Sequence, residues 1–210
     1  WTETATYSYV GGNLVTITTA IDELDFSNDQ VSLREAIHVS NGNPGADVSH
    51  FDIDAMGDRL ISLQLGEMSI TDSLTIAGEQ SQRVTIDGLS QSRLFAIAAE
   101  SGDVQMRPLI LRGGATTAER SGGGAIRSMS TGTLRLEQTQ LIDNHTYGSD
   151  SPGGAIDAAA GVISLLRTHV ENNTTSGSKS GGGALHIDGE AIVSSTTISG
   201  NSTLGMESDG

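Results

Sequence analysis

Three side chains that could take part in acid–base chemistry recur at equivalent positions of the sequence. Arg127, Asp157 and His186 lie 30 and 29 residues apart, each directly after an apolar residue. If successive repeats stack as neighbouring strands, these side chains lie about 5 Å apart and could exchange protons with a bound molecule. The same pattern also suits cross-strand ion pairing on a solvent-facing sheet. Two interpretations therefore stay open, a catalytic row and a structural row of paired charges.

A second group of candidates lies in three segments whose sequences vary between repeats, Ala115–Ser121, His145–Pro152 and Thr174–Ser180. Each segment follows the same apolar run of its repeat, so we expect three stacked loops on one side of the molecule. Loops on a rigid scaffold are frequent positions for binding residues, and the alternative is that they are tolerated insertions. The predicted ligand-binding residues are Glu119, Tyr147, Asp150 and Lys179.

Acidic side chains near the N-terminus are the candidates for a metal site. Asp22, Asp25 and Asp29 lie in one short segment and offer the oxygen ligands that calcium prefers, although their spacing is not that of an EF-hand. The alternative is a solvated acidic loop. The absence of cysteine excludes disulfides, thiol catalysis and cysteine-based zinc sites. The sequence predicts no cofactor, with calcium in this loop as the candidate ion.

The candidates from Arg127 to His186 belong to a repeat that runs from Ser121 to Asn201, and Glu119 lies just before it. Its glycine-rich corners are Gly124-Ala125-Ile126, Gly154-Ala155-Ile156 and Gly183-Ala184-Leu185. Its closing residues are Asn144, Asn173 and Asn201, and a degenerate earlier unit contains Val104, Met106, Leu109, Leu111 and Gly114. Units of about 30 residues cannot bury an apolar face alone and must stack on one another.

Within each unit the apolar residues alternate with a period of two, which predicts short strands and no long helix. Stacked units then pair strand on strand in parallel, about 4.8 Å apart. The sequence therefore predicts an all-β fold, a parallel β-helix of three short strands per coil, right-handed by the usual sense of parallel crossovers.

Three columns of this stack can be assigned from the repeat. The expected core column is Leu136, Leu165 and Val193, and the expected amide ladder at one corner is Asn144, Asn173 and Asn201. A third column, Thr139, Thr168 and Thr196, shares the parity of buried Leu141, Val170 and Ile198. These threonines are expected to point inward or to a corner, which argues against an outward row of threonines such as an ice-binding surface needs.

Residues 1–60 are predicted to form an N-terminal cap and residues 61–210 the coils, in one continuous domain. Ser32 and Glu35 match a capping box at the start of a helix over residues 32–40, with Leu33, Ala36 and Ile37 on one face. Such a helix would cover the first coil, whose strand edges could otherwise pair with other chains. The strands predicted before the repeat are Leu14–Thr18, Phe51–Ile53, Ile61–Leu65, Met68–Ile70, Leu74–Ile76, Val84–Ile86 and Leu94–Ile97.

Composition limits the functional classes. The chain has 210 residues, a formal net charge of −15 and 27 glycines, with only three Phe, three Tyr and one Trp. The negative charge argues against nucleic acid, whose phosphates attract Lys and Arg, and no apolar run is long enough to span a membrane. The chain begins at Trp1 without a cleavable apolar segment and stops at Gly210, where the next glycine corner is due. We expect a mature segment of a longer polypeptide.

Two motifs resemble a known family. Val31-Ser32-Leu33-Arg34-Glu35-Ala36-Ile37, followed by Asn41-Gly42-Asn43-Pro44-Gly45-Ala46-Asp47, resembles the N-terminal cap of bacterial surface proteins called CSLREA-domain proteins, with Val31 in place of the usual cysteine. The Gly-Gly-Gly-Ala-Ile and Ile-Ser-Gly-Asn-Ser-Thr units are similar to the parallel β-helix repeats of chlamydial polymorphic outer-membrane proteins and autotransporter passengers. The resemblance implies export, a cell-surface or extracellular location and adhesion, and implies no catalytic residue.

The functional hypothesis that follows is a non-catalytic segment of an exported surface protein. It would act as an adhesive or spacer stalk whose stacked loops bind polysaccharide or a host-surface glycan. The alternative is a polysaccharide lyase or glycoside hydrolase, because many parallel β-helices degrade acidic polysaccharides. The hydrolase motifs Asn-Thr-Asp, Asp-Asp and Gly-His-Gly are missing from the sequence, which leaves Arg127, Asp157 and His186 as the residues for that alternative.

Overall fold

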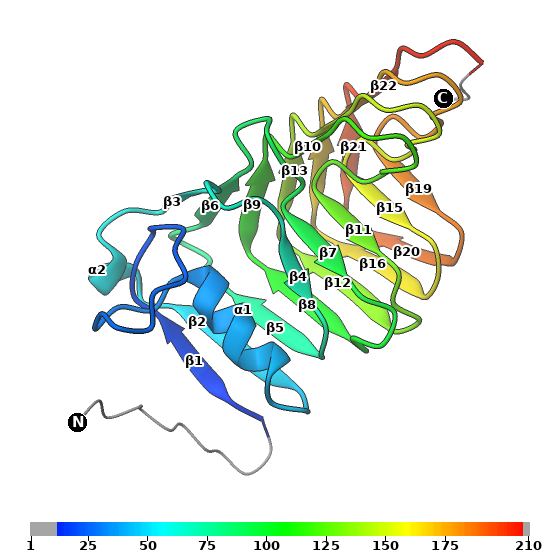
Figure 1. Ribbon diagram of the computed structural model, residues 1–210. Helices are drawn as coiled ribbons and strands as arrows, with labels where there is room; N and C mark the ends of the chain where they lie inside the picture. Colours follow the sequence, from blue (N-terminus) through cyan, green and yellow to red (C-terminus); the bar gives the residue numbers. More distant parts are fainter. Residues whose placement is uncertain (1–11, 208–210) are drawn as a thin grey trace.

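The computed structural model describes residues 12–207, and these residues form a parallel β-helix (Figure 1). Figure 1 shows the coils stacked along one axis, from the blue N-terminal coil to the red C-terminal coil. Every strand pair between named strands is parallel, as the repeat predicts. The strands form four sheets, called here A, B, C and D, that run along the axis on different sides of the coils.

Sheet A is the longest and contains a strand from every coil. Its order is β1-β2-β5-β8-β12-β16-β20. These strands are β1 (Leu14–Ile17), β2 (Asp47–Phe51), β5 (Leu74–Ala77), β8 (Val104–Arg107), β12 (Thr133–Glu137), β16 (Val162–Leu166) and β20 (Glu190–Ser194).

Sheets B and C form two further sides. Sheet B contains β3 (Leu60–Ser62), β6 (Val84–Asp87), β9 (Leu109–Arg112), β13 (Gln140–Ile142), β17 (His169–Glu171) and β21 (Thr197–Ser199). Sheet C contains β4 (Met68–Ile70), β7 (Phe95–Ile97), β11 (Ile126–Ser128), β15 (Ile156–Ala158) and β19 (Leu185–Ile187).

Sheet D is an addition to the three strands that the repeat predicts for each coil. It joins four two-residue strands, β10 (Ala115–Thr116), β14 (His145–Thr146), β18 (Thr174–Thr175) and β22 (Ser202–Thr203). The first three of these strands each open one of the three variable loops. The loops therefore start from backbone that is already paired between coils.

The register follows the spacing of the repeat. Leu74 pairs with Val104, and Val104 pairs with Leu134, so the degenerate unit is a true coil. Leu136 pairs with Leu165, and Leu165 with Val193. The inward side chains of the three larger sheets then form one continuous apolar core. Each fully buried leucine in it contributes about 1.5–3 kcal/mol.

Two predictions for the core and strands need correction. Val193 occupies its expected column but is 49% exposed, and Ile198 is similarly exposed, because no further coil of the described chain covers the interior of the last one. Ile53 is not in a strand, since β2 ends at Phe51 and Ile53 begins the short helix α2 (Ile53–Met56). Asp52 caps that helix by accepting a hydrogen bond from the Ala55 amide at 3.0 Å.

The predicted N-terminal helix is confirmed as α1 (Leu33–Asn41). Ser32 accepts from the Glu35 amide, and the Glu35 carboxylate accepts from the Ser32 amide at 2.8 Å, which completes the capping box. Leu33, Ala36 and Ile37 are buried, and α1 packs against β1, β2 and β4 at the N-terminal end of the solenoid (Figure 1). The helix thus covers the first coils as expected.

The asparagine ladder is also confirmed. The Asn144 side-chain amide donates to Asn173 Oδ1 at 2.9 Å, and the Asn173 amide donates to Asn201 Oδ1 at the same distance. Each amide nitrogen also donates to a backbone carbonyl of the preceding coil, as Asn173 does to Leu141 at 3.0 Å. In the degenerate coil before the three clear repeats, Gly114 takes the place of asparagine, and its backbone amide donates to Asn144 Oδ1. The ladder therefore joins four successive coils through one corner.

The inward threonines bond to backbone in the same way. Thr139 and Thr168 are fully buried, and the Thr168 hydroxyl donates to the Leu136 carbonyl at 3.1 Å. The Thr196 hydroxyl donates to the Leu165 carbonyl at 3.2 Å. These side chains are coil-to-coil links and form no outward row, which confirms the inward assignment.

The core column can be tested with Leu136→Asp. An unpaired carboxylate in the apolar interior costs several kcal/mol, which is a large fraction of the about 5–15 kcal/mol stability of a typical domain. We expect cooperative thermal unfolding to disappear in circular dichroism. Tyr147→Ala, which truncates an exposed side chain, should melt as the parent does, and equal melting of the two variants would refute the column assignment.

The ladder can be tested with Asn173→Ala. This change removes the side chain that bonds the Leu141 carbonyl and the Asn144 amide in the buried corner. We therefore expect the free energy of unfolding, measured by urea denaturation, to fall by about 2–3 kcal/mol. The matched control is Asn172→Gly at the neighbouring exposed position, where φ is +56° and glycine is tolerated. A loss at Asn173 no larger than at Asn172 would contradict the ladder's role.

Candidate functional site

The three variable loops stack closely on one another and are called here the loop ridge, residues 115–121, 145–152 and 174–180. Each loop closes on itself because the threonine that precedes it donates to a serine carbonyl five residues later. Thr146 bonds Ser151 at 2.7 Å and Thr175 bonds Ser180 at 2.8 Å, with Thr116 and Ser121 joined likewise. The predicted stacking of these loops is therefore present.

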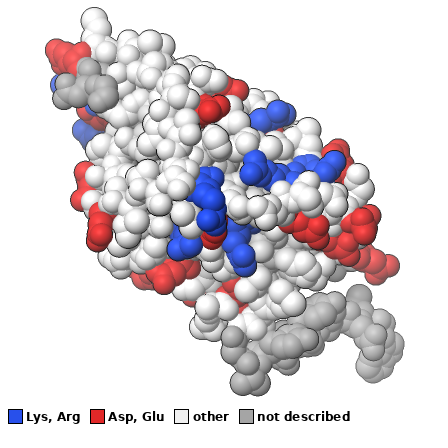
Figure 2. Space-filling view, turned by 180° about the vertical axis from the view of Figure 1, so that it is seen from behind, with Lys and Arg blue, Asp and Glu red and all other residues white. Residues whose placement is uncertain are grey.

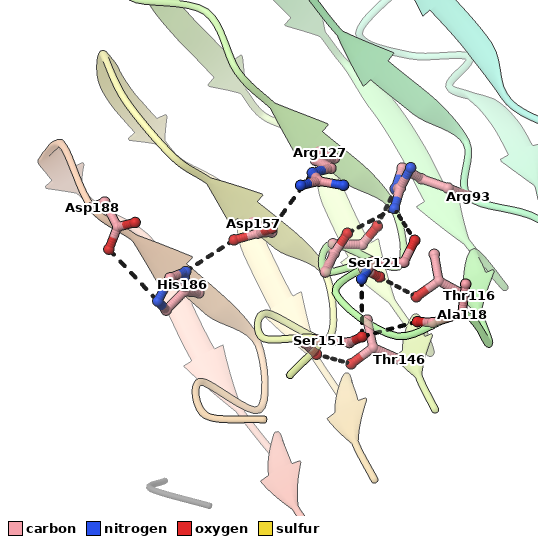
Figure 3. A network of polar contacts seen from close by, with 12 residues as sticks. Arg93, Thr116, Ala118, Ser121, Arg127, Thr146, Ser151, Asp157, His186 and Asp188 are labelled. Atoms are coloured by element: carbon pink, nitrogen blue, oxygen red, sulfur yellow. Dashed lines mark hydrogen bonds and ion pairs between the residues drawn. The ribbon is translucent and has the colours of Figure 1, made fainter. Parts of the chain in front are cut away.

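Serine side chains link one loop to the next. The Ser121 amide donates to Ser151 Oγ at 3.0 Å (Figure 3), and the Ser151 amide donates to Ser180 Oγ at 2.9 Å. Ser151 and Ser180 are completely buried. Glycine allows this close approach, because a Cβ added to Gly148 would lie 2.0 Å from the Ala118 carbonyl oxygen. The ridge is thus a fixed surface built by short polar residues.

The tips of the loops carry a row of alternating charge. Arg120, Asp150, Lys179 and Glu207 occupy equivalent positions, all with φ between 53° and 57°. The Arg120 amide donates to the Ser149 carbonyl, and the Asp150 amide to the Ser178 carbonyl, both at 3.0 Å. Neighbouring tips therefore lie side by side with opposite charges, an arrangement that favours stacking. Asp150 and Lys179 are exposed as predicted, and this row gives them a structural role.

Tyr147 forms an aromatic platform on the same ridge. Its ring stacks on the His145 ring with centroids 3.8 Å apart and planes 6° from parallel, and its side chain is 49% exposed. His145 Nε2 is bonded to the Ser176 hydroxyl of the next coil. Burial lowers the pKa of His145, so that its neutral form is favoured beside the tyrosine. Glu119, the other predicted binding residue, is exposed on the first loop.

The structure brings together the three predicted catalytic candidates on the outer face of sheet C. Arg127 pairs with Asp157, and Asp157 with His186, in the parallel register. Asp157 Oδ1 lies 2.9 Å from His186 Nδ1, and its Oδ2 lies 3.8 Å from Arg127 Nε (Figure 3). His186 Nε2 is 3.7 Å from Asp188 Oδ1. We call this row, Arg127, Asp157, His186 and Asp188, the charged wall.

Asp157 is the least accessible member of the charged wall. Only 9% of the residue is exposed, and its carboxylate lies over the backbone of Gly122 in the preceding coil. A Cβ added to Gly122 would lie 2.5 Å from Asp157 Oδ2. Oδ1 therefore contacts His186 of the next coil, and Oδ2 lies near Arg127 and Gly122 of the preceding coil. His186 Nε2 is the atom of the wall that could exchange a proton with a bound molecule.

Arg93 binds the end of the first loop of the ridge and the glycines that follow it, and sequence reasoning missed it. Only 7% of the residue is exposed, and its guanidinium donates to the carbonyls of Gly122 and Gly123 at 2.9 and 2.8 Å and to Ser121 Oγ at 2.8 Å (Figure 3). Glu67 accepts its fourth bond at 2.7 Å. Burial lowers the pKa of Arg93, and the Glu67 carboxylate opposes that shift.

The acidic loop does not bring its three aspartates together. Asp22 is bound to Arg34 at 2.7 Å and accepts from the Gln64 and Leu65 amides. Asp25 accepts from the Ser27 hydroxyl and amide, and these bonds lower the pKa of its carboxyl. Within residues 12–207 no three His, Asp or Glu side chains form a group that could hold a metal ion. Asp22 therefore has the role of fastening the cap to β3 and β4.

Two hollows of the described surface lie away from both candidate areas. One of about 500 Å³ lies at the cap between the Thr19–Asp22 segment, Met56 and Gln64. A smaller one of about 200 Å³ lies beside α2, near His50 and Gln82. Neither is lined by a residue of the charged wall or the loop ridge.

The serine and threonine ladders of the loop ridge could have been predicted from the spacing of the repeat. Ser121, Ser151 and Ser180 recur at spacings of 30 and 29 residues, and so do Thr116, Thr146 and Thr175, close to the 29- and 28-residue spacings of the asparagines. Those columns could have been assigned as ladders. Arg93 had no such signal, because it lies in a coil where the repeat is degenerate.

The fold and these two areas define the chain as a parallel β-helix with a polar ridge and a paired charged face. No protein-family model, curated protein or solved structure matches it. The helices of residues 12–207 include none that is long and apolar enough to cross a membrane.

The lowered pKa of His145 has a consequence for stability. The unfolded chain, with a His pKa near 6.5, binds a proton more readily than the folded chain does. The contribution of His145 is therefore complete above about pH 6.5 and is lost as pH falls towards the lower folded pKa. We expect the melting temperature to fall between pH 7 and pH 5 by more in the parent than in His145→Gln. Identical pH profiles would contradict burial as the cause.

Proposed function

We propose that this chain is a non-catalytic segment of an exported bacterial surface protein and acts as a spacer stalk that binds glycans through the loop ridge. The observation that carries the proposal is the Tyr147–His145 stack, an exposed aromatic face held on a rigid surface. An aromatic ring offers apolar area at low entropic cost, and its hydroxyl adds a polar contact. A sugar ring, with one apolar face and a rim of hydroxyls, matches such a platform.

Hydroxyl groups around the platform support a neutral saccharide. Thr174 pairs with His145 in sheet D, and its hydroxyl lies 3.2 Å from that of Ser202. The Ser176 hydroxyl contacts His145 directly. These groups can donate and accept hydrogen bonds and carry no charge. Ser176 and Thr174 thus add polar groups beside the His145 ring of the platform.

The cell-surface part of the proposal rests on the cap and repeat motifs. The segment from Val31 to Asp47 resembles the cap of CSLREA-domain surface proteins, and in this chain it forms the capping helix and the start of β2. The regular coils behind it are suited to a stalk, because each added coil extends the axis by about 4.8 Å.

The charged wall supports a second candidate, a polysaccharide lyase or hydrolase. Arg127, Asp157 and His186 are contiguous, and His186 Nε2 faces outward towards Asp188. However, Asp157 is buried and serves as a link between coils, which favours the structural interpretation of the row. Calcium is kept as a variable in the test below because several β-helix enzymes depend on it.

The test is a screen of the purified chain against neutral and acidic glycans, with calcium and with chelator, that records both binding and the unsaturated product of a lyase. We expect binding without turnover, weakened at least tenfold by Tyr147→Ala and largely retained in Tyr147→Phe, which keeps the ring. Loss of the ring removes stacking worth about 1–2 kcal/mol.

The matched control for this screen is His186→Gln on the charged wall. The proposal requires that variant to bind as the parent does. Turnover that His186→Gln abolishes would instead establish the enzyme, and the absence of binding to every glycan would leave a spacer without adhesion.

A further inference from the structure

Basic side chains are few in this chain, and one group of them lies together on one face. There are 11 Lys and Arg against 26 Asp and Glu. Figure 2 shows the rear face of the molecule, with Lys and Arg side chains gathered in its middle. Four arginines lie where sheet A turns into sheet B, on four successive coils. We call Arg83, Arg107, Arg135 and Arg167 the arginine corner.

The strand register places these four residues together. Val84 pairs with Leu109, so Arg83 lies beside Pro108, the residue after Arg107. In the next coil Arg135 lies in β12, two residues before Glu137, which stacks on Arg107 through the pairing of Leu136 with Met106. Arg167 follows β16 in the coil after that, at the position equivalent to Gln138. The corner is therefore a row of guanidinium groups along the solenoid axis.

The positive charge of the row is only partly neutralised within the chain. Glu137 accepts from Arg135 at 3.3 Å and is also paired with Arg167. Its carboxylate is mostly buried, whereas the side chains of Arg135 and Arg167 are 43% and 52% exposed. Among the described residues no carboxylate lies within ion-pair distance of Arg83 or Arg107. The one acid paired within the corner therefore neutralises two of its four bases, and Arg107 faces solvent.

Three other arginines differ in this respect. Arg34 is bound to Asp22, Arg93 is buried with four hydrogen bonds, and Arg112 is paired with Asp87 at 2.8 Å. Structural pairing therefore accounts for those residues. It does not account for four neighbouring guanidinium groups with a single shared acid, whose mutual repulsion costs stability.

We propose that the arginine corner binds an acidic polysaccharide that lies along the solenoid axis. Guanidinium forks match carboxylate and sulfate groups in geometry and bind them through paired hydrogen bonds. A uronate-bearing or sulfated polysaccharide carries such groups at intervals along a flexible chain, and the coils present the arginines at intervals of about 4.8 Å or its multiples. The inference extends the proposed glycan-binding role to a second surface and does not depend on the loop ridge.

The net charge of −15 restricts which polyanion fits. The Debye length is about 8 Å at physiological ionic strength, so the corner attracts an anion that follows the row, while more distant acids are screened. A nucleic acid duplex has a denser charge and a wider footprint, which would also meet the surrounding acidic surface. The polysaccharide is therefore the polyanion favoured by the charge distribution.

The experiment measures binding of polygalacturonate and of chondroitin sulfate to the full chain by calorimetry, with dextran as the neutral polymer and with NaCl raised from about 0.05 M to 0.5 M. We expect both acidic polymers to bind and dextran not to bind at this surface. The double variant Arg107→Gln/Arg167→Gln should weaken acidic binding at least tenfold, and raised salt should weaken it in the parent.

The matched control is Arg112→Gln, which also removes an exposed guanidinium but lies at the far end of β9 and is paired with Asp87. It should bind the acidic polymers within about twofold of the parent, and thermal melting should show that all variants are folded. Equal weakening by the control, no binding of either acidic polymer, or tighter binding of duplex DNA through the same arginines would each overturn the proposal. Tyr147→Ala separates this surface from the loop ridge, because it should leave acidic binding unchanged.

Discussion

Hydrogen bonding between successive coils is the constraint on which the rest of this structure depends. Parallel pairing fixes neighbouring backbones about 4.8 Å apart on every side of the solenoid, including the side that carries loops. A residue in one coil therefore always faces its equivalent in the next. This explains why the polar interior is built from ladders of one residue type, asparagine at one corner, threonine at another and serine under the loop ridge.

The same constraint determines what the charged residues do. On the charged wall, Asp157 lies between Arg127 and His186 and against the backbone of Gly122. Its carboxylate therefore links neighbouring coils. On the loop ridge, charges of opposite sign alternate at the tips. The arginine corner departs from this rule, because four like charges lie together there and only Arg135 and Arg167 share the Glu137 carboxylate. A departure from local pairing is a reason to seek an external partner.

The sequence predicted the features that depend on spacing. The repeat of about 30 residues was sufficient to assign register, the core column, the asparagine ladder and the stacking of the loops, because stacking converts spacing directly into contact. The capping helix was predictable because Ser32 and Glu35 are a local signal. The conjunction of Arg127, Asp157 and His186 followed from the same spacing.

Other features had no spacing signal. Arg120, Asp150 and Lys179 have a positive φ, which is uncommon for residues other than glycine. Their residue types do not predict this backbone conformation. The strands of sheet D are too short to show alternation. The alternation of apolar and polar residues predicted that the Val193 side chain points inward, but it did not predict that the interior of the last coil is exposed. Arg93 and the arginine corner depend on contacts between coils where the repeat is irregular.

The most direct test of the account is amide hydrogen exchange at the tips of the loop ridge. Loops normally exchange quickly because their amides face water. If coil-to-coil bonding extends through the ridge, the Arg120, Asp150 and Lys179 amides, each bonded to a carbonyl of the next coil, should be protected nearly as well as amides of sheet A. Exchange at the rate of an unstructured loop would contradict the claim that the ridge is part of the rigid stack.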